Sequence, residues 1–199
     1  AEMLVSWLDR YPIVSIEDPL GEDDADAFVR LTRAAGDRLQ IVGDDFLVSD
    51  AALVADAAAI GAGNAVLLKP NQRGTLSETR AAWDAAQAHG YAGIVSARSG
   101  ETEDTTIVHL AVGWGTGQLK VGSFARGERT AKWNEVLRIE DALGAGATFA
   151  GMGALPIRRR SSGEPRLWIR SPSPMLSPIG VRGSRDEYGS WKMICIRRR

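Results

Sequence analysis

Short apolar runs recur along the chain at nearly constant intervals, and most are followed by a segment with helical periodicity. The runs begin about 26 residues apart, and they are IVSI (13–16), LQIV (39–42), AVLL (65–68), GIVS (93–96) and QLKV (118–121). They are mostly apolar without regular alternation, which is typical of strands buried on both faces of a parallel sheet. The pattern therefore predicts five successive βα units and an α/β fold.

The segments between these runs predict helices that begin at capping residues. Residues 24–35 form one apolar stripe at helical spacing, made of Ala27, Phe28, Leu31 and Ala34. Either Ser49 or Asp50 can cap the helix that follows, and Thr75 can cap the next one, because their side-chain oxygens accept first-turn N–H groups.

Polar side chains accompany every predicted strand, mostly at its end, and they distinguish two α/β architectures. Five strands fit an open doubly wound sheet or the C-terminal part of a (β/α)8 barrel. The polar groups are Glu17-Asp18-Pro19, Asp44-Asp45, Lys69, Ser96 to Ser99, and Lys120. One such group could be an ordinary solvated loop residue, but five in succession are typical of a barrel, whose strand ends converge on one site. We therefore expect a partial (β/α)8 TIM-type barrel of about five C-terminal βα units.

The charge of the chain is divided between an acidic body and a basic tail. Residues 158–199 contain eleven Lys and Arg against three Asp and Glu, a net charge of +8, whereas the remaining residues carry −9. We expect a barrel segment at 1–154 and an irregular tail at 155–199 that is disordered or non-native. Binding of this basic tail to nucleic acid is an alternative that the sequence leaves open.

Cysteine content and hydropathy bear on the cellular compartment. Cys195 is the single cysteine, so an intramolecular disulfide is excluded and a reducing compartment is favoured. No apolar run approaches the roughly 20 residues that cross a bilayer. The N-terminal AEMLVSWLDRYP is typical of an amphipathic helix and not of a signal peptide. We predict a soluble, cytoplasmic protein with no membrane partner, and we expect the chain to belong to a longer product.

Carboxylates at the first two strand ends indicate a metal site. Glu17 and Asp44 supply hard oxygen ligands, which suit Mg²⁺ better than softer metals. The two histidines, His89 and His109, are separated and lie within predicted helices. We therefore expect them at the surface or at the edge of the core, and not at a zinc site.

Amines and small polar groups at the later strand ends indicate an anionic substrate. Lys69 ends an apolar strand, where it can serve as a general base beside a bound cation. Lys120 is a second cation expected at the same site, and Arg98 and Ser99 form a suitable cradle for phosphate or carboxylate. With the metal, these groups fit proton abstraction next to a carboxylate.

Six segments in register resemble the C-terminal portion of the enolase family, over about residues 1–144. The segments are YPIVSIEDPLGEDD, IVGDDFLVS, LLKPNQRGTLSET, VSARSGETEDTT, GQLKVGS and RTAKWNEVLRIE. The resemblance implies a Mg²⁺-dependent lyase of glycolysis, a phosphopyruvate hydratase that reversibly converts 2-phosphoglycerate to phosphoenolpyruvate. Enolases commonly form dimers, so it also implies a homodimer.

The resemblance implies a role for each residue at a strand end. Lys69 matches the catalytic base that removes the C2 proton of 2-phosphoglycerate. Glu17 and Asp44 match metal ligands, and with Lys69 they lie in the implied substrate-binding site. Three further residues match groups that bind the substrate phosphate (Arg98, Ser99) and the substrate carboxylate (Lys120).

Two positions depart from the family pattern. Ala97 stands where enolases read His in Ser-His-Arg-Ser-Gly-Glu-Thr, so an imidazole that contacts the substrate is missing. Pro70 stands where enolases carry other residues, and its lack of an amide donor is tolerable at a strand end. The N-terminal domain, a third metal-binding aspartate and the glutamate associated with loss of the 3-hydroxyl have no counterpart here. We therefore expect the chain to be inactive alone.

Two other functions are alternatives. An acid dehydratase of the same superfamily, acting on a non-phosphorylated substrate, would not require the phosphate corner SxRSGETEDTT. A non-catalytic, enolase-like binding or scaffold protein is favoured by Ala97 and by the basic tail. Mg²⁺-dependent binding of a phosphorylated substrate analogue separates the scaffold from an impaired enzyme, because a scaffold need not bind the analogue.

Overall fold

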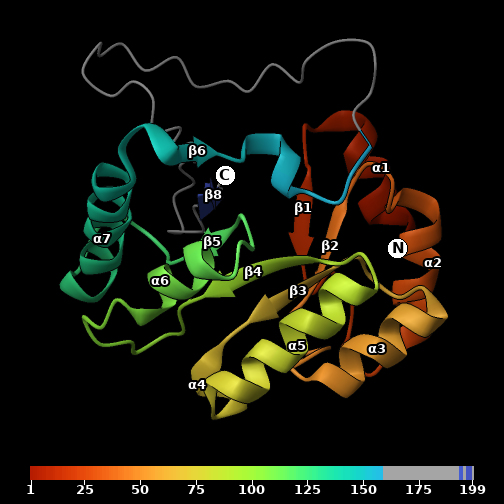
Figure 1. Cartoon of the computed structure of the whole chain (residues 1–199). Coiled ribbons are helices and arrows are strands. Elements are labelled where there is room, and N and C mark those ends of the chain that lie inside the picture. Colours follow the sequence, from red (N-terminus) through yellow and green to blue (C-terminus); the bar gives the residue numbers. More distant parts are fainter. Residues whose placement is uncertain (159–192, 195, 199) are drawn as a thin grey trace. The chain divides into compact units, whose positions relative to one another are not determined.

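The computed structural model describes residues 1–158, 193–194 and 196–198 of the chain, and most of its elements are labelled in Figure 1. The chain divides into two compact units. Unit 1 comprises Ala1–Gly93 with Leu155–Arg166, and unit 2 comprises Ile94–Ala154 with Leu167–Arg199. This division does not test the predicted boundary after residue 154. Most of the predicted tail lies outside the described residues, so its irregular character stays a prediction.

Unit 1 alternates strands and helices in the order that the sequence predicts. Its elements are α1 (Glu2–Arg10), β1 (Ser15–Glu17), α2 (Ala25–Ala35), β2 (Gln40–Gly43), α3 (Ala51–Ile60), β3 (Ala65–Leu68), α4 (Pro70–Arg73), α5 (Leu76–Ala88) and the start of β4 (Ala92–Ser96). β1 pairs in parallel with β2, with Ser15 opposite Gln40, and β2 pairs in parallel with β3, with Val42 opposite Ala65. Parallel strands joined by helices confirm the α/β prediction.

The core of unit 1 lies between its strands and helices. Every residue of β2 and β3 is buried, as their mostly apolar composition predicts. The one polar side chain, that of Gln40 in β2, donates a hydrogen bond to Ser15 Oγ over 2.9 Å. The helices α3 and α5 pack side by side, and α5 also contacts β3 (Figure 1). Phe28 of α2 stacks on Phe46, with ring centroids 4.1 Å apart. These contacts fix the strands, and hence the loops that follow them.

The helices begin at predicted caps, and the structure decides one open choice of cap and corrects one predicted core position. Asp50, and not Ser49, accepts first-turn N–H groups at the start of α3, and Thr75 does the same at the start of α5. The predicted stripe of α2 is wrong at one position, because Ala34 is exposed and Ala35 is buried. Ala35 follows Leu31 by four positions and therefore lies on the same helix face.

Unit 2 continues the βα pattern. Its elements are the rest of β4, α6 (Thr106–Gly113), β5 (Leu119–Lys120), α7 (Gly127–Leu143), the 3-10 helices η1 (Gly144–Gly146) and η2 (Gly151–Ala154), and the strands β6 (Ala147–Phe149), β7 (Met193–Ile194) and β8 (Ile196–Arg198). β4 pairs in parallel with β5, with Ser96 opposite Lys120. β7 is antiparallel to β5, and β8 is antiparallel to β6. Within the described part of the chain, no helix combines the length and the apolar character needed to cross a membrane.

Candidate functional site

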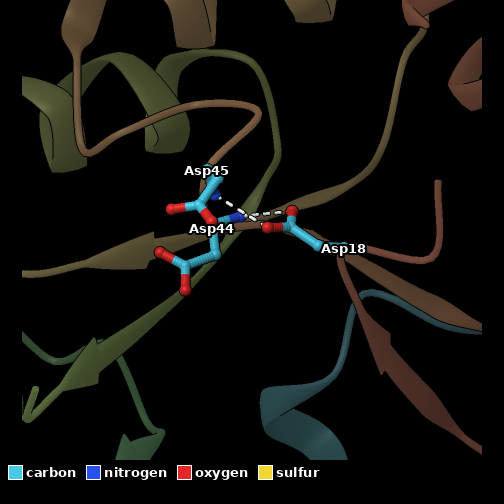
Figure 2. Close-up of side chains that lie close together, drawn as sticks. All are labelled: Asp18, Asp44 and Asp45. Carbon is cyan, nitrogen blue, oxygen red and sulfur yellow. Dashed lines mark hydrogen bonds between the residues drawn. The ribbon is translucent and has the colours of Figure 1, made fainter. Parts of the chain in front are cut away.

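The ends of β1 and β2 bring three aspartates together in unit 1. Asp18 follows β1, and Asp44 and Asp45 follow β2, which is its parallel neighbour. One carboxylate oxygen of each lies within 4.8 Å of the others. Figure 2 shows the carboxylate of Asp18 facing the backbone of the other two, whose N–H groups donate to it over 2.8 Å each. Asp18 therefore fixes the turn that carries Asp44.

The carboxylate of Asp44 connects the ends of β2 and β3. Asp44 is only 8% exposed, and its Oδ2 lies 2.5 Å from Nζ of Lys69. Its Oδ1 is buried and has no hydrogen-bond partner among the described residues. The side chain points away from Asp18 (Figure 2). Because burying an unpaired carboxylate oxygen is unfavourable, this oxygen is suited to a cation.

The donor atoms at this position fit a hard divalent cation. Carboxylate oxygens are the preferred ligands of Mg²⁺, and Asp44 Oδ1 offers one that no described residue engages. The second predicted ligand, Glu17, is the exposed last residue of β1. The three-carboxylate group found in the described residues consists of Asp18, Asp44 and Asp45, without Glu17. The assignment of Glu17 and Asp44 as metal ligands stays a prediction.

Lys69 is held at the end of β3 through its backbone as well as its side chain. It is 9% exposed, and its N–H donates to Ser49 Oγ over 2.9 Å. Ser49 is buried with φ of +54°, and its hydroxyl donates to Leu67 O over 2.9 Å. The sequence suggested Ser49 only as a helix cap. Its support of Lys69 was missed because a positive φ at a serine leaves no sequence signal.

The predicted phosphate-binding residues line a pocket in unit 2. Arg98 and Ser99 are exposed on the loop after β4 and border a pocket of about 170 Å³. Arg126 and Arg129, at the start of α7, line the same pocket. Guanidinium groups bind phosphate and carboxylate through several N–H donors, so the arrangement favours an anionic ligand. Arg126 and Arg129 are not among the predicted site residues, although both lie in the segment ARGER.

Two carboxylates also line this pocket, and each has a basic partner. Glu128 Oε1 lies 3.0 Å from Arg126 Nε. Glu101 Oε2 lies 3.2 Å from Nζ of Lys132, and the other oxygen of Glu101 accepts the N–H of Arg98 over 3.0 Å. The negative charge in the pocket is therefore balanced by neighbouring cations.

Ala97 and Lys120 lie beside each other at the ends of β4 and β5. The N–H of Ala97 donates to the carbonyl oxygen of Lys120 over 2.9 Å. Ala97 lines the pocket and is half-buried, and Lys120 is also half-buried. A methyl group thus borders the pocket at the position where the family resemblance implies an imidazole.

The loop between β4 and α6 carries a carboxylate, Asp104, that binds the first N–H of the helix. Asp104 Oδ1 accepts the N–H of Thr106 over 2.8 Å. Hydrogen bonds from the backbone and then the side chain of Thr106 lower the pKa of Asp104, with smaller Coulombic contributions from Lys132 and His109. The exposed side chain of His109 contacts Glu135 Oε1 over 3.0 Å, which agrees with the predicted surface position.

The structure brings the predicted residues together in two groups. Asp44 contacts Lys69 in unit 1, and Arg98 and Ser99 line one pocket in unit 2. The prediction that both groups, Glu17 and Lys120 face a common site stays a prediction.

Comparison with known proteins confirms the family resemblance. Residues 1–156 match the family described as the enolase C-terminal TIM barrel domain. Enolase 1 of Desulfitobacterium hafniense (strain Y51) is 52% identical over 151 residues, which are 76% of this chain and 35% of that protein. Enolase of Mycobacteroides abscessus is 56% identical over 149 residues, which are 75% of this chain and 35% of that protein. The α/β fold is therefore part of a TIM barrel, and the chain spans 35% of the length of these relatives.

Proposed function

We propose, because the chain belongs to the family of the enolase C-terminal TIM barrel domain, that it is the barrel portion of an enolase-type lyase. In the complete protein, this lyase would interconvert 2-phosphoglycerate and phosphoenolpyruvate in the presence of Mg²⁺. The observation that carries the proposal is the buried contact between Asp44 and Lys69 at the ends of adjacent parallel strands. We further propose that the protein acts in the cytoplasm as a homodimer.

In this reaction Lys69 is the general base. Its Nζ accepts the proton from C2 of 2-phosphoglycerate, and the electron pair of that bond forms the C2–C3 double bond as the 3-hydroxyl leaves as water. The second proton, which the departing hydroxyl takes up, comes from a group in the part of the relatives that this chain does not span. As a neutral amine, Nζ has the lone pair that accepts this proton. Ser49 at the backbone and Asp44 at Nζ keep Lys69 in place.

The remaining predicted residues bind the charged ends of the substrate. Mg²⁺, held by Glu17 and Asp44, would supply positive charge where proton removal builds up negative charge on the substrate carboxylate. Arg98 and Ser99 would bind the phosphate. Lys120 would contact the carboxylate.

The test supplies the segments of the relatives that this chain does not span. In a chimera, residues of this chain replace the matching segment of the Mycobacteroides abscessus enolase. Formation of phosphoenolpyruvate from 2-phosphoglycerate is then followed by its absorbance. Lys69→Ala should lower kcat by about 100-fold or more, because a positioned general base contributes a factor of this size.

The matched control is Arg80→Ala in the same chimera. Arg80 is a half-exposed cation on α5 that pairs with Asp84, and its removal should leave kcat within about twofold. A Lys69→Ala chimera with an unchanged rate would refute the role of Lys69 and the lyase assignment that depends on it.

A non-catalytic binding protein is the second candidate, and Ala97 is the observation that favours it. A scaffold has no need for a phosphorylated ligand, whereas an impaired enzyme still binds one. Mg²⁺-dependent binding of a phosphorylated substrate analogue to the chain would support the enzyme, and its absence would support the scaffold.

A further inference from the structure

Lys132 of α7 has an ammonium group that is completely enclosed in unit 2. The residue has 0% exposure, and its Nζ donates to the carbonyl oxygens of Thr102 over 2.8 Å and of Glu128 over 2.9 Å. It also lies 3.2 Å from Oε2 of Glu101. An ammonium group has three N–H donors, so these three oxygens match its full capacity.

Glu101 links Lys132 to the turn that carries the residues predicted to bind phosphate. Its side chain is 12% exposed, and Oε1 accepts the N–H of Arg98 over 3.0 Å while Oε2 faces Lys132. Lys132 also holds the backbone of Thr102, one residue further along the loop. The exposed turn from Arg98 to Gly100 is therefore linked to α7 on both sides. Its first residue is linked through Glu101, and the loop just after it is linked through the carbonyl oxygen of Thr102.

The energetic character of this contact argues for a positioning role. Removing two charged groups from water costs about as much as their attraction returns, so a buried ion pair is weak evidence for stability. An apolar side chain in the same space could stabilise α7 at least as well. A carboxylate whose two oxygens engage two different partners instead fixes a backbone geometry, because each hydrogen bond has a preferred direction.

We propose that Lys132 is a positioning residue that holds the Arg98–Ser99 turn, through Glu101, in the conformation that binds a phosphate group. The phosphate part of this inference rests on the proposed function. The clamp itself, from Lys132 to Glu101 to the N–H of Arg98, rests on the contacts alone.

Amide hydrogen exchange in the full ¹⁵N-labelled chain tests the clamp without a ligand. Lys132→Met removes the charge and keeps a long side chain, so Glu101 loses its partner and the N–H of Arg98 loses its fixed acceptor. We expect exchange at Arg98 to accelerate by about tenfold more than exchange at Val95, which lies in β4 and reports overall stability.

The matched control is Arg138→Met, which removes a cation from the exposed side of the same helix. Arg138 pairs with Glu135 and does not touch Glu101, so exchange at Arg98 and Val95 should stay within about twofold. An equal acceleration at Arg98 and Val95 in Lys132→Met would mean that Lys132 only stabilises the fold, and it would overturn the proposal.

Glu101→Gln decides the question if Lys132→Met does not fold. This variant keeps the size of the side chain and leaves both carbonyl partners of Lys132 in place. The neutral amide is a weaker acceptor than a carboxylate, so exchange at Arg98 should again accelerate more than at Val95. Unchanged relative exchange at Arg98 in Glu101→Gln would contradict the clamp.

Titration with inorganic phosphate and with 2-phosphoglycerate, followed at the amides of Arg98 and Ser99, tests the purpose of the clamp. Lys132→Met should raise the Kd for both by about tenfold or more, and Arg138→Met should not. An unchanged Kd in Lys132→Met would overturn the positioning role. Absence of binding by the unsubstituted chain would instead contradict the proposed function, while the exchange experiment still decides whether the clamp exists.

Discussion

Lys69 and Lys132 are both buried lysines, yet their surroundings suit different tasks. Each of the three N–H donors of Lys132 has an oxygen acceptor. Two of these acceptors are backbone carbonyl oxygens, which cannot move away unless the loop or the helix unwinds. Among the described residues, Lys69 Nζ contacts one oxygen atom, Oδ2 of Asp44, and Lys69 retains slight exposure. A lysine whose three donors are all engaged suits a structural clamp, whereas a lysine with one contact at Nζ suits a group that must reach a substrate.

Tyr91 gives a prediction at the residue scale. Its hydroxyl donates to Ala62 O over 2.6 Å, and burial raises the pKa of Tyr91 to about 12. In the unfolded chain the pKa is about 10, so the folded state holds this proton more tightly. The corresponding stabilisation, of about 3 kcal/mol at most, is complete below pH 10 and is lost as the pH rises from 10 towards 12.

Urea unfolding at a series of pH values checks this expectation. The free energy of unfolding should fall more steeply above pH 10 in the natural chain than in Tyr91→Phe, which has no proton to lose at this position. Parallel curves for the two proteins would contradict the shifted pKa.

At the scale of elements, α5 and the start of β4 pack closely at a glycine of the strand. A Cβ built on Gly93 would lie 2.5 Å from Cζ3 of Trp83 and 3.3 Å from Cδ1 of Leu68. Trp83 is 5% exposed, so its ring is enclosed and has little room to move. The close approach of helix and strand therefore requires glycine at this position.

Gly93→Ala should accordingly destabilise the protein by about 1–3 kcal/mol, the usual cost of overpacking a core. Gly113→Ala is the matched control, because Gly113 ends α6 and a Cβ there meets no atom within 4 Å. That change should be neutral or slightly stabilising. Denaturant midpoints measure both, and equal midpoints for the two variants would contradict the packing argument.

At the scale of the whole molecule, the chain spans 35% of the length of its enolase relatives. The family resemblance implies that one metal ligand and the group that assists loss of the 3-hydroxyl lie in the part not spanned. We therefore expect the isolated chain to turn over 2-phosphoglycerate at least about 100-fold more slowly than the chimera described above. Comparable rates for equal concentrations of the two proteins would contradict this expectation.

The fold was predictable from sequence to a large extent because its signals are local. β3 is found at the predicted residues, and the remaining parallel strands differ from their predicted bounds by no more than two residues at either end. Asp50 and Thr75 act as caps through bonds to residues within three positions of themselves. The one wrong member of the α2 stripe, Ala34, shows the limit of periodicity, since the sequence does not tell which of two adjacent alanines faces the core.

The sequence by itself determined the α/β class, the cap at Thr75 and the family, because all three are recorded in residue types at fixed spacings. Only the tertiary structure decided that Asp18 binds backbone N–H groups, that Ser49 supports Lys69, and that Lys132 reaches Glu101. These contacts join residues about 20 to 31 positions apart. Their geometry depends on strand register, positive φ angles and burial, which arise only when separate elements pack together.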